Sequence, residues 1–169
     1  MGSRVKLATF FAGNGVLLDG LKAQAESESL RAIFAGFINV DVLPSIYAMA
    51  DILVFPSERE PYGLSAREAI CLGLPLIVSD QIGCIGATDA ARPGQNALIY
   101  QSMNISELED SIVALASSPE KVKNMAKASL VIASEIGVES SVSGFVCAVQ
   151  SAYKKAAVYM TRGVRYDRN

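Results

Sequence analysis

Short apolar runs and amphipathic stretches alternate along the chain. A strand is predicted at residues 51–55, where a short, continuous apolar run from Ile52 to Phe55 follows Asp51. Residues 76–78 form a second such run, and runs of this kind are typical of buried parallel strands. Residues 64–72 between them carry apolar side chains at helical spacing, and Gly73 ends this predicted helix. The apolar positions of the helix are Ala66, Ala69 and Ile70. This stretch therefore predicts a strand, a loop, a helix and a second strand.

The same alternation continues on both sides of this unit. Further strands are predicted at residues 5–12, 31–36 and 97–100, and further helices at 17–30, 41–50, 106–115, 118–130 and 143–160. Strands that alternate with helices predict an α/β fold, a single domain built on a Rossmann-like, doubly wound parallel sheet with C-terminal helices. Right-handed crossovers then place the carboxyl ends of the strands at one edge of the sheet.

Capping residues predict where several helices begin and end. Asp41 is the expected cap of a short helix, Ser106–Glu109 has the spacing of a capping box, and Ser118 precedes a proline that opens the next helix. Gly137 is expected to break the chain before the last helix. The expected inner faces include Leu17, Leu21, Ala25, Val122, Met125, Leu130, Phe145, Val149 and Tyr153.

Composition restricts the chemistry. Of the 169 residues, 51% are hydrophobic, which is enough for one domain core, and the net charge of −2 argues against a general nucleic-acid surface. Histidine is absent, which excludes Ser-His-Asp and Cys-His mechanisms and His-based metal sites. Cys71, Cys84 and Cys147 lack metal-ligand spacing and are expected to be reduced. With no apolar run of membrane-spanning length and no signal peptide, we expect a cytoplasmic protein.

One loop combines a helix start with two carboxylates. Residues 60–65 follow the predicted strand at 51–55, so they lie at the sheet edge where ligands of such folds bind. The free N–H groups of the first helical turn, near Gly63, attract a phosphate, whereas Glu60 and Glu68 are suited to ligand hydroxyls. A phosphate together with vicinal hydroxyls describes a nucleotide sugar.

The same residues allow a purely structural interpretation. Ser65 and Glu68 have the spacing of a capping box, with Ser65 as the N-cap and Glu68 reaching back to its N–H. Glu60 is then a solvated loop charge. Gly13–Gly15, after the first predicted strand, is either a phosphate-binding turn or an ordinary one. Spacing alone leaves both interpretations open.

A longer pattern resembles a known family. Residues 56–80 read Pro-Ser-x-x-Glu-Pro-Tyr-Gly-Leu-x-x-x-Glu-Ala-x-x-x-Gly-x-Pro-x-x-x-Ser-Asp, which resembles the donor-site signature of the family 4 retaining glycosyltransferases, proteins of the GT-B fold. The Glu-x7-Glu pair at its centre is Glu60 and Glu68. The resemblance covers roughly residues 5–135, and the other matching stretches are Phe11–Gly15, Phe34–Phe37, Tyr47–Asp51, Asp89 and Pro93–Asn96.

The resemblance implies a role for each part of the site. Such proteins hold the nucleobase near the residues matching Phe37 and Ile38, and the ribose hydroxyls on the residue matching Glu68. The donor sugar meets Glu60, the expected catalytic residue, and the N–H groups near Gly63. The full set of expected donor-binding residues is Gly13, Gly15, Phe37, Ile38, Tyr62, Gly63, Leu64, Ser65 and Glu68. The implied reaction is retaining transfer from a nucleotide-diphosphate sugar to a polysaccharide, lipopolysaccharide or glycolipid acceptor, with no metal or cofactor required.

The chain also departs from the family pattern. It has no counterpart of the N-terminal acceptor domain, of the first strand of the donor domain or of the Arg-x4-Lys pair that clamps the diphosphate, and the usual Asn-Gly is Asn96-Ala97. We therefore expect residues 1–169 to be the C-terminal, donor-binding domain, which needs the acceptor domain as its partner and is inactive alone. The alternative is a non-catalytic nucleotide-sugar-binding or scaffold module. A nucleotide-sugar epimerase fits the Glu-x7-Glu stretch less well.

Residues 138–169 form the expected terminal helix and basic tail. The tail carries Lys154, Lys155, Arg162, Arg165 and Arg168. A basic end suits an anionic membrane surface, as in relatives that act on lipid-linked acceptors, although a solvated helix face and a frayed terminus are the simpler explanation. The apolar stripe of residues 145–153 is expected to be partly exposed and available for self-association.

Overall fold

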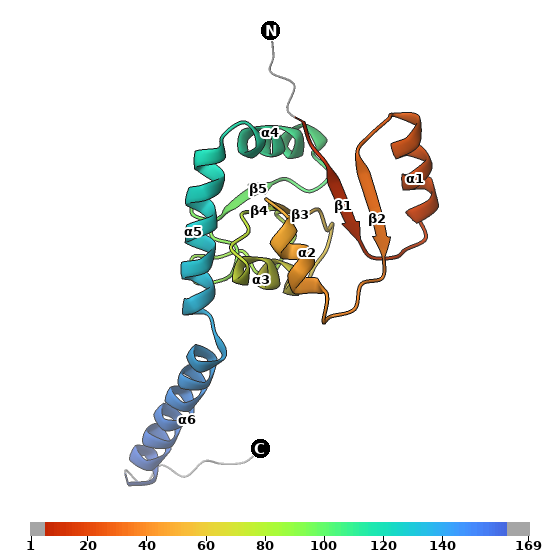
Figure 1. The fold of residues 1–169 in the computed structure, drawn as a ribbon. Coiled ribbons are helices and arrows are strands. Elements are labelled where there is room, and N and C mark those ends of the chain that lie inside the picture. Colours follow the sequence, from red (N-terminus) through yellow and green to blue (C-terminus); the bar gives the residue numbers. More distant parts are fainter. Residues whose placement is uncertain (1–5, 162–169) are drawn as a thin grey trace.

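Helices and strands alternate along residues 6–161, the part of the chain that the computed structural model describes (Figure 1). The strands are β1 (Thr9–Ala12), β2 (Ala32–Gly36), β3 (Leu53–Phe55), β4 (Leu76–Ser79) and β5 (Ala97–Tyr100). The helices are α1 (Leu18–Ser27), α2 (Leu43–Met49), α3 (Leu64–Cys71), α4 (Ile105–Ala116), α5 (Pro119–Glu135) and α6 (Val138–Thr161). Each predicted strand and helix is present, with ends shifted by a few residues.

The strands form two parallel sheets. β1 pairs with β2, whereas β4 lies between β3 and β5, with Leu76 opposite both Leu53 and Ala97. Every pair is parallel, so the predicted Rossmann-like α/β class is confirmed. The expected single sheet does not form, because no pairing joins β1 to β3 in the described part of the chain.

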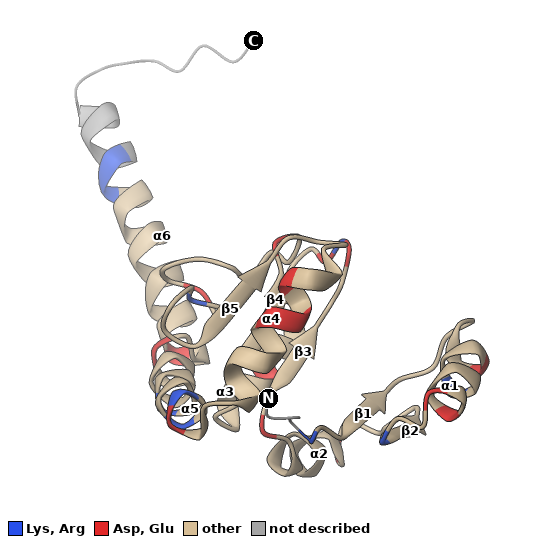
Figure 2. Cartoon of the chain, turned by 90° about the horizontal axis from the view of Figure 1, so that it is seen from above, with Lys and Arg blue, Asp and Glu red and all other residues tan. Residues whose placement is uncertain are grey.

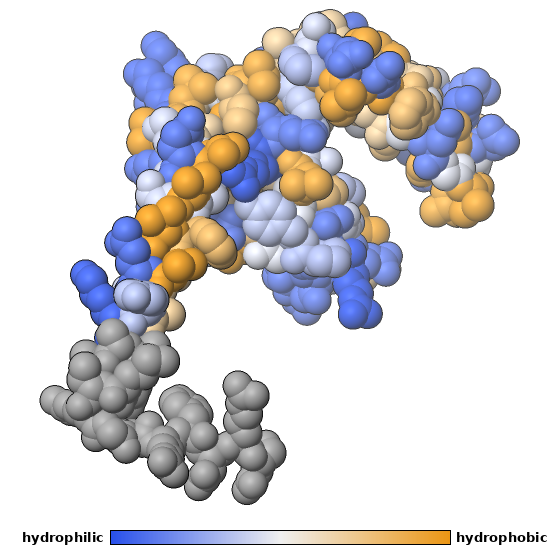
Figure 3. Space-filling model, turned by 90° about the horizontal axis from the view of Figure 1, so that it is seen from below, coloured by the Kyte–Doolittle hydropathy of each residue, from blue (hydrophilic) through white to orange (hydrophobic). Residues whose placement is uncertain are grey.

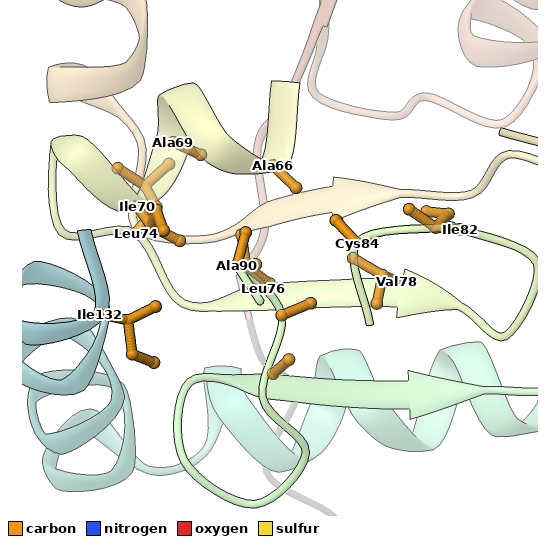
Figure 4. Close-up of a cluster of buried hydrophobic side chains, with 12 residues drawn as sticks. Ala66, Ala69, Ile70, Leu74, Leu76, Val78, Ile82, Cys84, Ala90 and Ile132 are labelled. Carbon is orange, nitrogen blue, oxygen red and sulfur yellow. The ribbon is translucent and has the colours of Figure 1, made fainter. Parts of the chain in front are cut away.

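The core lies around β4, whose four residues are all buried. Successive side chains of a strand point to opposite faces, so β4 buries Leu76 and Val78 on one side and Ile77 on the other. On the first side, Ile70 of α3 and Ile132 of α5 complete a cluster of alanines and aliphatic residues (Figure 4). On the second side the cluster includes Tyr100, Leu115 and Met125, so helices cover both faces of this sheet.

β1, α1 and β2 form a unit that contributes to neither core cluster. Ala25 is the buried residue of this unit, whereas the apolar side chains of Phe10 and Ile33 are exposed. Phe11 and Phe34 stack on one another with their ring centroids 4.6 Å apart. The unit is therefore held together mainly by its strand pairing, and its apolar surface has no cover in the described part of the chain.

Two predicted helix faces differ from the structure. Leu17 and Leu21 are exposed because the α1 unit does not reach the main core. On α5, Leu130 is exposed and Ser129 is buried. The Ser129 hydroxyl donates a hydrogen bond to the Leu74 carbonyl oxygen at 2.7 Å, so a satisfied polar side chain occupies a position where apolar spacing predicts none.

The predicted capping residues of two helices near the loops are wrong. α2 begins after Val42 rather than being capped by Asp41. α3 begins after Gly63, which has a left-handed backbone conformation, so Ser65 lies inside the first turn and is not the N-cap. The capping-box interpretation of Ser65 and Glu68 is therefore excluded by the position of the helix start.

The predicted capping residue of α4 is also wrong, whereas that of α5 is confirmed. Asn104, not Ser106, caps α4, and its side-chain oxygen accepts a hydrogen bond from the Glu107 N–H at 3.2 Å. Two overlapping Asn/Ser-x-x-Glu patterns occur here, and Asn caps as well as Ser, so spacing could not choose between them. Ser118 caps α5 as predicted.

α6 begins directly after Gly137, which breaks the chain as predicted, and starts earlier than residue 143. Phe145, Val149 and Tyr153 are all exposed. Figure 3 shows the resulting orange stripe along this helix. The predicted exposure of the apolar stripe is confirmed, whereas the arginines of the basic tail lie outside the described residues.

No single helix within residues 6–161 is long and apolar enough to cross a membrane. α5 and the part of α6 up to Lys155 meet that criterion only together, and they are bent by 42° where they meet. Figure 2 shows the positions of acidic residues in red on α4 and one blue, basic band near the end of the described part of α6. The basic residues of that part of the sequence are Lys154 and Lys155.

Candidate functional site

Gly63 shapes the loop between β3 and α3. Its φ of 107° lies in the left-handed region, and the residue is buried. A Cβ at this position would stand 2.9 Å from Cγ2 of Ile82 and 3.1 Å from Sγ of Cys84. Only glycine therefore lets the chain turn here and enter the helix at this angle.

The first turn of α3 presents free backbone donors. The N–H groups of Ala66 and Arg67 donate to the Gly63 carbonyl oxygen at 3.1 and 3.3 Å. The N–H groups of Leu64 and Ser65 make no hydrogen bond to any described residue. Free N–H groups at a helix N-terminus, together with the helix dipole, favour an anion such as a phosphate.

Glu60 is fixed through its backbone and its carboxylate. Its N–H donates to the Gln81 carbonyl oxygen at 3.1 Å, and its carbonyl oxygen accepts from the Gly83 N–H at 3.0 Å. Its Oε1 accepts from the Tyr62 N–H at 3.2 Å. The expected donor-site N–H of Tyr62 is thus occupied by Glu60 in this structure, and the two groups form one unit.

The loop of residues 81–96 packs against the Glu60 loop. The Tyr62 hydroxyl donates to Asp89 Oδ1 at 3.3 Å, and the same oxygen accepts from the Ala90 N–H at 2.8 Å. A Cβ at Gly83 would stand 2.0 Å from the Pro61 carbonyl oxygen. Gly83 and Asp89 therefore hold the Glu60–Gly63 segment in place, a role that no local spacing in the sequence indicates.

Cys84 is buried beneath this loop. Burial, followed by the negative charges of Asp89 and Glu60, raises the pKa of its thiol to about 11. The thiol is therefore neutral at pH 7. No group of three or more His, Cys, Asp or Glu side chains within the described residues is arranged to hold a metal ion.

Glu68 is bonded to a tyrosine from another helix. The Tyr47 hydroxyl on α2 donates to Glu68 Oε2 at 2.9 Å. Burial, followed by the Glu68 carboxylate, raises the pKa of Tyr47 to about 12, so the hydroxyl is a donor at neutral pH. Glu68 Oε1 makes no hydrogen bond to a described residue, and the side chain is exposed. Tyr47 lies in a matching stretch of the sequence, but its contact with Glu68 is not readable from spacing.

The remaining expected residues belong to the other sheet. Gly13 follows β1 with a φ of 139°, and its N–H donates to the Gly36 carbonyl oxygen at 2.8 Å. Phe37 follows β2 with 81% of its surface exposed. Gly15 and Ile38 lie beside them in the chain, and no described hydrogen bond joins this group to the Glu60 loop. Their convergence with Glu60 and Glu68 in one crevice remains a prediction.

The β3–α3 loop therefore combines anion-binding N–H groups with two carboxylates of different surroundings. Glu60 is half-buried and bonded within its own loop, whereas Glu68 is exposed and has one oxygen available. This arrangement suits a ligand that carries phosphate groups and hydroxyls, because the N–H groups and the carboxylates otherwise favour opposite charges.

Comparisons of the sequence with known proteins identify a family. A sequence model of the family described as "Glycosyl transferases group 1" matches residues 3–130. A D-inositol 3-phosphate glycosyltransferase from Segniliparus rotundus is 25% identical over 172 aligned residues, which cover 97% of this chain and 36% of that protein. Across three curated relatives, the chain spans 18%, 36% and 26% of their lengths.

Solved structures share the fold. HepE from Anabaena in complex with UDP superposes with a TM-score of 0.73 and 22% identity, covering 86% of this chain and 41% of that one. The C-terminal domain of a glycosyl transferase group 1 family protein from Francisella tularensis superposes with a TM-score of 0.63 and 16% identity, covering 75% of this chain and 83% of that one.

Proposed function

The chain belongs to the glycosyl transferases group 1 family, and from this membership we propose that it is the donor-binding domain of a retaining glycosyltransferase. The observation that carries the proposal is the free N-terminal turn of α3 flanked by Glu60 and Glu68. The bound UDP in the Anabaena relative supports a nucleoside diphosphate as the ligand class.

We assign the ligand groups as follows. The diphosphate lies against the N–H groups of Leu64 and Ser65, which have no partner among the described residues. The ribose diol donates to Glu68, whose exposed carboxylate has one oxygen available. The donor sugar meets Glu60, the proposed catalytic residue. The Tyr62 N–H, now bonded to Glu60, is released to the donor when Glu60 turns to the sugar.

The other expected residues complete the proposal. Phe37 and Ile38 hold the nucleobase, for which the exposure of Phe37 provides a free face. Gly13 and Gly15 let the turn after β1 approach the ligand closely. Gly63, with its left-handed backbone conformation, lets the chain enter the first turn of α3 at Leu64.

Catalysis is then mainly electrostatic. As the bond from the sugar to the diphosphate breaks, negative charge grows on the leaving phosphate and positive charge on the sugar ring. The N-terminus of α3 stabilises the negative charge on the leaving phosphate, and the Glu60 carboxylate stabilises the positive charge on the sugar ring. Because Gly83 and Asp89 already hold the loop, little reorganisation is needed at the moment of reaction.

The same family membership supports a proposal for the domain assignment. We propose that residues 1–169 are the C-terminal domain, with residues 138–169 as a terminal helix and tail, and that an acceptor domain is its partner. Sheets of this class have the strand order 3-2-1-4-5-6. The two observed sheets, β2-β1 and β3-β4-β5, match that order with the central strand left out. The chain alone is then half a site, inactive in transfer.

We also propose an acceptor class and a location for the protein. The acceptor is a polysaccharide, lipopolysaccharide or glycolipid, and the protein acts in the cytoplasm. The exposed apolar stripe of α6 is available to the acceptor domain, to a second copy or to a membrane surface, the last aided by Lys154 and Lys155.

Calorimetric titration tests the proposal. We expect UDP or GDP to bind the chain weakly, yet about tenfold more tightly than the corresponding nucleoside, because the diphosphate is the group that meets α3. No transfer from a UDP-sugar or GDP-sugar to an added acceptor is expected. Equal affinity for nucleoside and nucleoside diphosphate would remove the basis of the assignment.

A further inference from the structure

Tyr47 connects the two helices that flank β3. It lies on α2, and its hydroxyl donates to Glu68 Oε2 on α3 at 2.9 Å. Its ring packs against the main core cluster, so the hydroxyl extends from an anchored aromatic group. Glu68 itself is an exposed residue on a helix surface, where a long carboxylate side chain is otherwise free to change rotamer.

From this juxtaposition we infer that Tyr47 is a positioning residue for Glu68. Tyr47 holds Oε2 so that Oε1 faces the cis-diol of the ribose. The inference rests on the proposed ribose role of Glu68. A diol offers two hydroxyl donors, and a carboxylate whose orientation is fixed in advance binds them without the entropic cost of ordering it.

The protonation state of Tyr47 agrees with this role. A phenol donates to a carboxylate only while it is protonated, and the pKa of Tyr47 is raised to about 12, first by burial and then by Glu68 itself. The hydroxyl therefore remains a donor throughout the neutral range. A bond to a carboxylate is charge-assisted and stronger than one between neutral groups, so it is able to restrain the side chain.

A purely structural role makes a different prediction. If Tyr47 served only to join α2 to α3, its loss would lower the melting temperature of the protein. It would also reduce the affinity for all nucleotides by the same factor. A positioning role changes the preference for a ligand with a diol over the same ligand without one. The two roles are therefore separable by comparing UDP with 2′,3′-dideoxy-UDP.

The experiment titrates both ligands into wild type, Tyr47→Phe, Glu68→Gln and the control Tyr153→Phe, which alters an exposed tyrosine on α6. Tyr47→Phe keeps the ring in the core. We expect wild type to prefer UDP, and Tyr47→Phe to reduce that preference by about three- to fivefold, with dideoxy-UDP affinity unchanged within about twofold. Tyr153→Phe should behave as wild type.

The double variant completes the test. If Tyr47 acts through Glu68, adding Tyr47→Phe to Glu68→Gln should cause no further loss of preference. An additive loss would mean that Tyr47 acts independently, and a wild-type preference in Tyr47→Phe would overturn the inference while leaving the ribose role intact. If Glu68→Gln also keeps the preference, or wild type has none, the ribose role fails and the inference with it.

Discussion

Gly83 lies so close to Pro61 that a methyl group added at Gly83 would stand 2.0 Å from the Pro61 carbonyl oxygen. The loop after β4 is therefore in close contact with the loop that carries Glu60. The Gly83 N–H also donates a hydrogen bond to the Glu60 carbonyl oxygen at 3.0 Å. The two loops of the candidate site therefore form one packed unit, and its geometry depends on the lack of a side chain at Gly83.

The first prediction concerns this contact. Gly83→Ala should destabilise the protein by about 1–3 kcal/mol, because the backbone of Pro61 cannot move away as a flexible side chain would. It should also weaken UDP binding, because the Glu60 segment shifts. Thermal melting and calorimetry measure both effects.

Gly86→Ala is the matched control in the same loop. Its added methyl would meet only Asp89 Cβ, at an ordinary 3.7 Å, so the change should stay within about 0.5 kcal/mol. Equal melting temperatures for the two alanine variants would mean that the loops are not packed together in solution.

The second prediction concerns local stability. β1 donates to β2 through every other N–H, as at Thr9 and Gly13, so the N–H groups of Phe10 and Ala12 point to the unpaired edge. These two amides should exchange with deuterium faster than that of Ile77 in buried β4 by about two orders of magnitude.

Exchange measured by NMR or by fragment mass spectrometry is suitable for this comparison. Protection of the Phe10 and Ala12 amides equal to that of Ile77 would show that a partner, such as a second copy, already covers the edge of β1. Repeating the measurement at several protein concentrations separates that case from a monomer.

Strand positions in the main sheet could be predicted because each strand is a continuous apolar run. β4 is buried at all its residues, and the run at 76–78 predicts it almost to the residue. The spacing of apolar residues within a strand does not show which strand pairs with it. The sequence therefore could not predict that β1 pairs with β2 and with no other strand in the described part of the chain. The exposure of Phe10, which lies in the predicted strand at residues 5–12, is likewise a consequence of this pairing and not of the local sequence.

The sequence predicts candidate residues for the site, but it does not predict the hydrogen bonds that join them to distant parts of the chain. Glu60 and Glu68 follow from one contiguous pattern. The bonds of Tyr47 to Glu68 and of Tyr62 to Asp89 join residues 21 and 27 positions apart, and they depend on how helices and loops pack. The N-cap of α3 was misread because a left-handed glycine, rather than the nearby Ser65, begins the helix.

The third prediction concerns acid stability. Asp80 Oδ1 accepts from the Ser102 N–H at 2.9 Å, and this bond is the main reason that the pKa of Asp80 lies below its ordinary value of 3.8. The carboxylate therefore stabilises the fold above that value, and the contribution is lost as the pH falls through the lowered pKa of the folded state.

Asp80→Asn keeps an accepting oxygen but removes the charge. Wild type should melt at a higher temperature than Asp80→Asn near neutral pH, and the difference should shrink below about pH 4. Asp110→Asn, at an exposed carboxylate with no hydrogen bond to a described residue, is the control. A difference that is constant with pH would show that the charge of Asp80 does not contribute.

The last prediction tests the helix N-terminus with a change that deletes one N–H. Leu64 is the first residue of α3, a position where proline is favoured because its missing N–H has no helical acceptor. Leu64→Pro should therefore leave the helix start intact, with a stability change within about 1 kcal/mol. It removes a proposed donor to the diphosphate, and a hydrogen bond to a charged group contributes about 1.5–3 kcal/mol. UDP affinity should fall by about tenfold or more.

Two controls separate the N–H from other effects of Leu64→Pro. Leu64→Ala removes the side chain and keeps the N–H, so it should bind UDP as wild type does. Ile105→Pro places proline at the first residue of α4, where the replaced side chain is similarly exposed, at 78% against 66% for Leu64. It should also leave UDP affinity unchanged. If Leu64→Pro melts like wild type and still binds UDP with wild-type affinity, the phosphates do not meet the α3 N-terminus. Glu60 and Glu68 would then flank a helix start with no anion-binding role, and the donor-site proposal would have to be withdrawn.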